Sequence, residues 1–341
     1  MAIDSLPDLR RHLRWAMKVE LSTIPPYLCA LYSIPRGSNV EAATLLRSVV
    51  MEEMLHLTLA ANVLNAVGGK PHLDISSAVP RYPRPLPHSD DRFKVELLPL
   101  SLKAVEIFLR IEKPSPPGAR PQGDRYATIG QFYEAVEQAL TELTHKLGAE
   151  KVFTGKAHRQ VPPGMWYYGG GGDVIVVHDL ESALRALHEI TEQGEGLDHT
   201  IVDGDAQFND VDELAHYFRF EELRRGRRFL ATDTPQTGPT GDELPVDWRA
   251  VLPMQPNPRS ADYVDHPTIH RQMVKFNRIY TRLLRQLQQA FTGTPEVLRD
   301  GVATMYELRY QAEALMRIPS PLYEGRTVGA PFEFDDGEGE P

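Results

Sequence analysis

The sequence lacks the features of several classes of protein. It contains a single cysteine, Cys29, in 341 residues, so an intramolecular disulfide framework is excluded and a reducing compartment is expected. The N-terminus has charged residues and no apolar signal core, and no apolar run approaches the length of a membrane span. The net charge of −10 with no basic block argues against nucleic acid and anionic membranes as partners. We therefore expect a cytoplasmic protein.

The composition is that of a globular protein with a sizeable core, because 41% of the residues are hydrophobic and 25% are charged. A helical spacing of apolar residues predicts two long N-terminal helices, two in the middle of the chain and two near its end. Pro25 and Pro26 interrupt the first of these and are expected to kink or redirect it. The predicted helices span about 5–33, 39–67, 180–195, 210–225, 267–291 and 295–316.

Residues 72–178 read as an insertion between the helix pairs. The proline-rich stretch 72–92 predicts ordered loop, and candidate strands lie at 93–100 and 174–178. Ser101 can cap a helix that ends near Ile111, and Thr128 with Gln131 forms a capping-box pattern before a helix over 129–147. We expect residues 1–330 to form one domain and the acidic end, 331–341, to be a flexible tail.

Two glutamates and a histidine fall on apolar helix faces. At 100° per residue, Glu20 lies at the centre of the first helix's apolar stripe, and Glu53 lies at the centre of the second. His56 follows Glu53 at i+3 on the same face. An unpaired carboxylate in a core is costly, and a bound cation would make its ionised form favourable. These residues therefore indicate a metal site.

A Glu-x-x-His unit occurs twice, at Glu53–His56 and at Glu213–His216. Two such units, plus one glutamate from each of two further helices, make up the carboxylate-bridged two-metal sites of helix bundles. For the acid between the units we choose Glu195, which lies between two glycines, with Glu192 as the alternative if a π-bulge rotates that turn. Oxygen-rich ligands with a few imidazoles favour iron, two per chain, with manganese as the alternative.

Each piece also has a structural explanation. A single Glu-x-x-His occurs by chance on many helix surfaces, and Glu20 can pair with Arg14 or Lys18. Glu52 is rotated off the apolar stripe, so it is either solvated or a support for a ligand. Tyr27 lies on the stripe of Glu20 and is either a packing residue or a donor that reaches the site. The order of the four acidic pieces along the chain favours the metal site.

Long segments resemble one known family. ELSTIPPYLCALYSI (20–34), SVVMEEMLHLTLAANVLNAVGGKP (48–71), ITEQGEG (190–196), HYFRFEEL (216–223) and FNRIYTRLLRQLQQAF (276–291) are similar to the ferritin-like family of the iminophenyl-pyruvate dimer synthase type. That family includes the ferritin-like portions of enzymes that join two oxidised tryptophan units on the way to violacein and rebeccamycin. The resemblance implies a mostly α fold: a ferritin-like four-helix bundle with an α+β or loop insertion and two additional C-terminal helices. It also implies metal-binding glutamates and histidines, which map here to Glu20, Glu53, His56, Glu213 and His216.

The functional expectation is a non-haem, di-iron oxidoreductase of secondary metabolism. Its substrate would be a small amino-acid-derived metabolite or imine, its oxidant dioxygen or peroxide, and its catalytic residues Glu53, His56 and Tyr27. A second copy of the chain or a biosynthetic enzyme is the candidate protein partner. The alternatives are an iron-storage or redox-protection protein, and a non-catalytic structural module of a biosynthetic complex.

Overall fold

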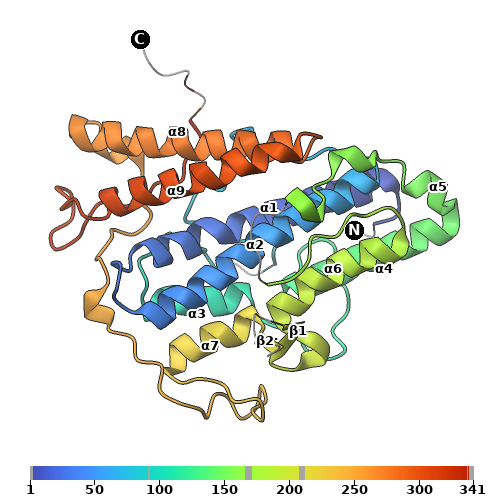
Figure 1. The fold of residues 1–341 in the computed structure, drawn as a ribbon, viewed down its shortest axis with the longest axis horizontal. Coiled ribbons are helices and arrows are strands. Elements are labelled where there is room, and N and C mark those ends of the chain that lie inside the picture. Colours follow the sequence, from blue (N-terminus) through green and yellow to red (C-terminus); the bar gives the residue numbers. More distant parts are fainter. Residues whose placement is uncertain (1–2, 91–92, 166–170, 207–211, 336, 338–341) are drawn as a thin grey trace.

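The computed structural model describes residues 3–90, 93–165, 171–206, 212–335 and 337. Helices dominate this part of the chain (Figure 1). The helices are α1 (Leu6–Tyr32), α2 (Val40–Ala66), α3 (Leu102–Ile111), α4 (Ile129–Leu147), α5 (Ala149–Val152), α6 (Leu180–Glu195), α7 (His216–Arg225), α8 (Pro267–Ala290) and α9 (Leu298–Leu315). Two short strands, β1 (Val202–Ala206) and β2 (Asp212–Leu214), pair antiparallel. No helix among the described residues is both long and apolar enough to cross a membrane.

The long helices α1 and α2 pack along each other and form the spine of a bundle (Figure 1). At one end of this spine α4 packs on α1, α6 packs on α2, and α4 and α6 contact each other. Near the other end α3 and α7 form a second contacting pair. The insertion therefore supplies two bundle helices, α3 and α4, whereas we expected it to lie outside the bundle. Their buried apolar faces, which include Phe108 and Phe132, explain why they join the core.

Helix α1 continues through Pro25 and Pro26 without a break. A proline has no N–H, so Pro26 leaves the carbonyl of Ser22, four residues earlier, without its helical donor. The hydroxyl of Tyr82, from the proline-rich segment, donates to that carbonyl at 2.7 Å. The side chains of Ser22 and Thr23 also donate to carbonyls within this turn. The carbonyl that Pro26 leaves without a helical donor is thus paired by a residue of the proline-rich segment.

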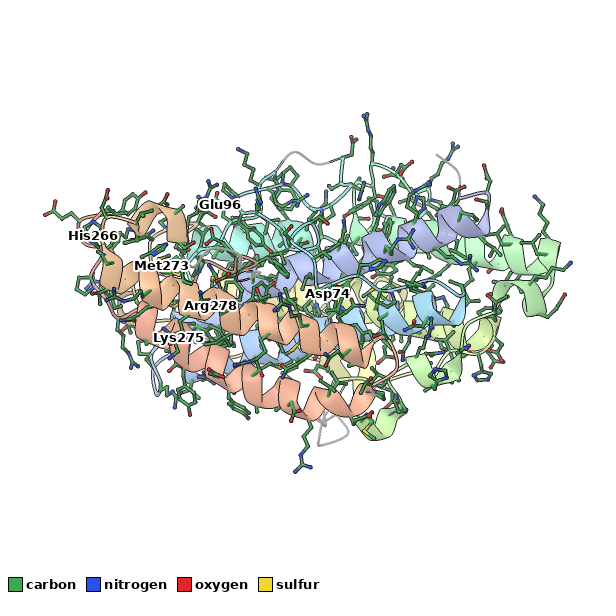
Figure 2. The ribbon with its side chains drawn as sticks, turned by 90° about the horizontal axis from the view of Figure 1, so that it is seen from above. Asp74, Glu96, His266, Met273, Lys275 and Arg278 are labelled. Carbon is green, nitrogen blue, oxygen red and sulfur yellow. The ribbon has the colours of Figure 1, made fainter. Side chains whose placement is uncertain are left out.

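Helices α8 and α9 pack against each other and lie over the outer side of α1 and α2 (Figures 1 and 2). The segment that follows α9 returns to α8. Phe332 is 1% exposed, and the carboxylate of Glu333 accepts hydrogen bonds from Asn277 and Ser260. The prediction of a flexible tail from residue 331 is therefore wrong for residues 331–335; residues 336 and 338–341 lie outside the described part of the chain.

Three predictions of local structure need correction. Residues 174–178 form no strand, because their backbone groups pair with side chains such as Gln160 and Asn62. Residues 93–100 contribute only a single bridge, between Val95 and Arg84. Helix α7 begins at His216 and not near 210, so Glu213 lies on β2. Local apolar patterns do not distinguish a buried extended segment from a strand.

Candidate metal centre

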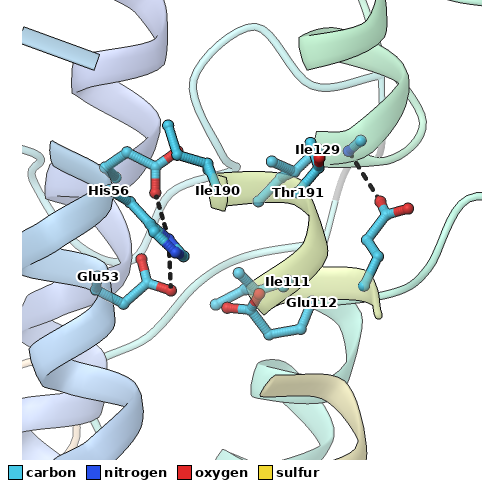
Figure 3. A pocket seen from close by; sticks show the side chains of 11 residues that line it. Glu53, His56, Ile111, Glu112, Ile129, Ile190 and Thr191 are labelled. Carbon is cyan, nitrogen blue, oxygen red and sulfur yellow. Dashed lines mark hydrogen bonds and ion pairs between the residues drawn. The ribbon is translucent and has the colours of Figure 1, made fainter. Parts of the chain in front are cut away.

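Five side chains that can ligate a metal come from four helical elements and meet inside the bundle. Figure 3 labels Glu53, His56 and Glu112 of this group. Glu20 comes from the middle of α1, and Glu53 and His56 come from successive turns of α2. Glu112 follows the last residue of α3, and His216 is the first residue of α7. Each is at most 6% exposed. The structure thus brings together Glu20, Glu53, His56 and His216, as the sequence predicted, and adds Glu112.

The Glu53 carboxylate lies at the centre of this group. Its Oε1 atom is 3.1 Å from Nδ1 of His216 and 3.9 Å from Nδ1 of His56. Nδ1 of His56 is 3.6 Å from Oε2 of Glu20, and Nδ1 of His216 is 3.6 Å from Oε2 of Glu112. Ligand atoms of Glu53, His56 and His216 all lie within 4.8 Å of one another. These separations suit side chains that share a cation.

Both imidazoles present Nδ1 to the acids and are held from behind through Nε2. Nε2 of His56 is 2.8 Å from Oε1 of Gln193, and Nε2 of His216 is 2.8 Å from Oε2 of Glu52. An Nε2–H donated to these acceptors leaves the Nδ1 lone pair directed at the carboxylate group. Nδ1 of His216 makes no well-aligned hydrogen bond within the described chain. This is the orientation that metal-binding histidines take.

Hydroxyl groups hold the three carboxylates from the other side. Thr23 donates to Oε2 of Glu53, Tyr133 of α4 donates to Oε1 of Glu20, and Tyr27 donates to Oε1 of Glu112. Each carboxylate keeps one oxygen turned toward the imidazoles. Tyr27 is therefore within reach of the site, as the sequence allowed. A hydroxyl donor fixes a carboxylate's rotamer while leaving the second oxygen available to a ligand.

The electrostatics of the group favour a bound cation. Burial, together with the neighbouring Glu112 carboxylate, raises the pKa of Glu53 to about 7. Burial alone would lower the pKa of His216, but the carboxylates of Glu112, Glu52 and Glu53 raise it well above its ordinary value. Without a metal, the site therefore retains protons to offset its clustered negative charge. A divalent cation can replace those protons, so the donor set fits a metal.

Glu52 belongs to a buried network behind His216 and not to solvent. Its second oxygen, Oε1, accepts a hydrogen bond from Arg219 at 2.9 Å. Arg219 also contacts Asp203 at 3.1 Å and Glu213 at 3.2 Å. Burial would raise the pKa of Glu52, but Arg219 and His216 lower it to about 2. Glu52 is therefore not solvated, and it contacts His216, one of the predicted ligands.

Glu213 does not complete the second Glu-x-x-His unit. Because α7 begins at His216, the two residues are not on successive turns of one helix, and Glu213 pairs with Arg219. The described part of the chain brings Glu112 toward His216 instead. The helical spacing was assumed across a segment that forms β2 and an N-terminal cap.

The two acids predicted from α6 have other surroundings. Glu195 lines the cavity, but its carboxylate accepts hydrogen bonds from the backbone N–H groups of Gly130 and Ser115, at 2.9 Å each. It thereby caps the N-terminus of α4, and a Cβ at Gly130 would come within 2.3 Å of it. Glu192 is partly exposed and is not among the residues that line the cavity. The position expected for these acids is taken by Glu112.

A cavity of about 20 Å³ adjoins the carboxylates and is walled on its far side by Ile111, Ile129 and Ile190. A space of this size holds one water-sized molecule. The sequence carries a signal for Glu112, because this residue continues the apolar stripe of Val105 and Phe108 at helical spacing. Gln193 and Tyr133 carried no comparable signal, because their roles depend on how α6 and α4 meet the spine.

Comparisons with known proteins agree with this architecture. A family model described as ferritin-like matches residues 13–225, more than half of the chain. The dichlorochromopyrrolate synthase of Lentzea aerocolonigenes is 28% identical over 98% of this chain and 36% of its own length. The 2-imino-3-(indol-3-yl)propanoate dimerase of Chromobacterium violaceum is 26% identical over 97% of this chain and 34% of its own length. The chain thus spans about a third of the length of these curated relatives.

A solved structure supports the fold. A ferritin-like protein from Caulobacter vibrioides is 21% identical, has a TM-score of 0.63, and is matched over 98% of this chain and 100% of its own. The relatives, the family match and the bundle confirm the resemblance seen in the sequence and the mostly α, ferritin-like fold. The chain belongs to the ferritin-like family.

Proposed function

We propose that this protein is a metal-dependent oxidoreductase that acts on a small amino-acid-derived imine, with dioxygen or peroxide as the oxidant. The observation that carries the proposal is the arrangement around Glu53, where the Nδ1 atoms of His56 and His216 face one buried carboxylate oxygen. Gln193 and Glu52 bind the two imidazoles through Nε2 and leave each Nδ1 available to a ligand. A purely structural site would not need this arrangement.

The residues that would hold the metal are Glu20, Glu53, His56, Glu112 and His216. Glu112 takes the place that the sequence predicted for Glu195 or Glu192, and Glu213 pairs with Arg219. Two iron ions per chain are proposed, with manganese as the alternative, because carboxylates and imidazoles suit both. When bound, such metals supply redox equivalents and a binding position for the oxidant.

The chain's own residues control protons and water at this site. Glu53, whose pKa is raised to about 7, can release a proton when the cation arrives and accept one later. Tyr27 donates a hydrogen bond to Glu112 and Tyr133 donates one to Glu20, and both bonds can persist while the charge of the site changes. The cavity of about 20 Å³ admits an oxidant of the size of water while its isoleucine wall excludes bulk solvent.

The names of the relatives support the substrate class. One is a dimerase of 2-imino-3-(indol-3-yl)propanoate. Joining two such molecules by a new C–C bond, with loss of one hydrogen from each, removes two electrons and two protons from the pair. One hydrogen peroxide accepts these two electrons and two protons and becomes two waters. We propose this oxidative class of reaction for the present chain.

Metal content and oxidant consumption together test the proposal. The full chain, purified from iron-supplemented cells, is expected to carry about two iron or manganese ions by elemental analysis. With an amino-acid-derived imine it is expected to consume dioxygen or peroxide faster than with iron alone. Metal-free protein would contradict the site, and iron turnover unaffected by any imine would favour iron storage.

The Tyr27→Phe variant tests the catalytic role we give to Tyr27. It removes one donor to Glu112, so we expect bound metal to be retained while oxidant consumption falls about 10–100-fold. The Tyr32→Phe variant changes a second buried tyrosine of α1 for which no contact to the acid group is seen, and serves as the control. Equal rates for Tyr27→Phe and the wild type would remove Tyr27 from the mechanism.

A further inference from the structure

A second cavity, of about 480 Å³, lies between the outer side of α1 and α2 and the α8–α9 pair. It opens away from the acid group, since Met54 and Leu57 line it while the adjacent residues Glu53 and His56 face the bundle interior. Its volume falls in the range of small-molecule sites, which is about 300–1,000 Å³. The space is therefore large enough for an organic molecule of moderate size.

Most of the cavity wall is apolar and only partly covered. Leucine, isoleucine, methionine and valine side chains from all four helices form it, and several remain half-buried, including Leu28, Met54, Leu287, Val302 and Met305. The surface lies between two packed layers of helices. Binding an apolar molecule there removes apolar surface from water and therefore lowers the free energy. The wall therefore favours a ligand that is mostly apolar.

The two arginines of the wall lie toward one end of the cavity. Arg47 lies near the start of α2 and Arg309 near the end of α9, and both line the wall where α1 finishes. The Arg36–Glu313 ion pair just beyond α1 places the end of α9 beside the end of α1. Arg309 also contacts Glu313, so two arginines share one carboxylate there. With the exposed Arg47, this end has more cations than anions.

A buried hydroxyl belongs to the same wall. Tyr280 of α8 is 3% exposed, and its hydroxyl has no hydrogen-bond partner within the described chain. A buried hydroxyl left unpaired costs free energy unless a ligand or water pairs with it. Tyr280 lines the cavity from the middle of α8. Its orphan hydroxyl is therefore an independent sign of a missing ligand.

From these features we infer a second ligand site that binds a monocarboxylate with an extended apolar body. The arginines would receive the carboxylate, Tyr280 would donate to or accept from the bound molecule, and the apolar wall would cover the remainder. Two sources share this chemistry, an aliphatic fatty acid and an aryl-alkyl carboxylate. This inference does not depend on the proposed oxidoreductase activity.

Calorimetric titration of the full chain with sodium decanoate, decanol and indole-3-butyrate tests the inference. We expect at least one carboxylate to bind, and decanoate to bind about 10-fold or more tightly than decanol, because a charge-assisted hydrogen bond is lost with the alcohol. Tighter binding of decanoate would support the aliphatic source, and tighter binding of indole-3-butyrate the aryl source. Equal affinities for decanoate and decanol, or binding of neither carboxylate, would overturn the site.

Variants separate this cavity from non-specific binding. Arg47→Gln with Arg309→Gln should remove the preference for decanoate over decanol, whereas Arg282→Gln, an exposed α8 arginine that does not line the cavity, should keep it. Val302→Trp should fill the space and abolish binding of both, with the helical spectrum and thermal midpoint confirming a folded protein. Undiminished binding to a folded Val302→Trp variant would place the ligand elsewhere and contradict the inference.

Discussion

Nδ1 of His216 lies 3.1 Å from Oε1 of Glu53, although the two residues belong to different helices and are far apart in the sequence. The contact depends on α7 beginning at His216, which places the imidazole at the start of the helix and beside α2. Glu52, the neighbour of Glu53, holds the same imidazole through Nε2. Two consecutive acids of α2 thus position both sides of one histidine.

The Glu112→Ala variant is expected to lose at least half of the bound metal. Glu112 is 6% exposed and is the carboxylate nearest Nδ1 of His216 apart from Glu53. Elemental analysis of Glu112→Ala, with Glu106→Ala on the exposed side of α3 as the control, checks this. A Glu112→Ala protein with full metal and a Glu192→Ala protein without it would restore the earlier assignment to α6.

Glu52 and Glu213 are expected to differ in their effect on metal affinity. Glu52→Gln removes the charged partner of His216 and should weaken metal binding about 10–100-fold. Glu213→Gln removes one of the acids around Arg219 but leaves Glu52 and Asp203, so affinity should change little. Competitive titration with a metal-binding dye measures both variants. A larger loss for Glu213→Gln would mean that Glu213 is a ligand.

The metal-free protein is expected to become more stable as the pH falls from about 8 to 6. The pKa of Glu53 is raised from 4.5 to about 7 in the folded protein, so the folded state binds more protons than the unfolded state in this window. His56 and His216, whose pKa values are also raised by their carboxylate partners, act in the same direction. Each additional proton bound by the folded state raises the free energy of unfolding by at most roughly 1.4 kcal/mol for each pH unit that the pH falls.

Urea unfolding at pH 6, 7 and 8 measures this dependence. The metal-loaded protein should show the opposite trend, because protons then compete with the cation. Glu53→Gln in the metal-free state should flatten the curve, since it removes the titrating carboxyl. A metal-free wild type that loses stability toward pH 6 would show that these groups do not hold protons in the folded state.

Tyr82 and Pro26 are expected to be energetically coupled. Tyr82→Phe leaves the buried carbonyl of Ser22 unpaired and should lower the free energy of unfolding by about 1–3 kcal/mol. In a Pro26→Ala background an N–H becomes available to that carbonyl, so the same change should cost less. Denaturant unfolding of the two single variants and the double variant closes the cycle. Additive losses would show that the Tyr82 hydroxyl does not replace a helical donor.

The two spine helices, and the three residues that they place inside the bundle, follow from the sequence alone. Glu20, Glu53 and His56 follow from helical periodicity alone, because an acid at the centre of an apolar stripe points to the core wherever that helix packs. The long motifs shared with the family established the ferritin-like fold. Helices α3 and α4 were also expected as helices, from Ser101 and Thr128 at their caps.

Which of the remaining acids meet these three residues depends on how the helices pack together. Glu112 lies beside His216 because α3 ends next to α7. Glu195 instead caps α4, because α4 begins next to α6. Glu213 pairs with the buried Arg219. Each of these outcomes depends on the placement of a helix end by contacts distant in the sequence. Periodicity gives the face on which a side chain lies but not the partner that the face meets, so this choice lies beyond local pattern.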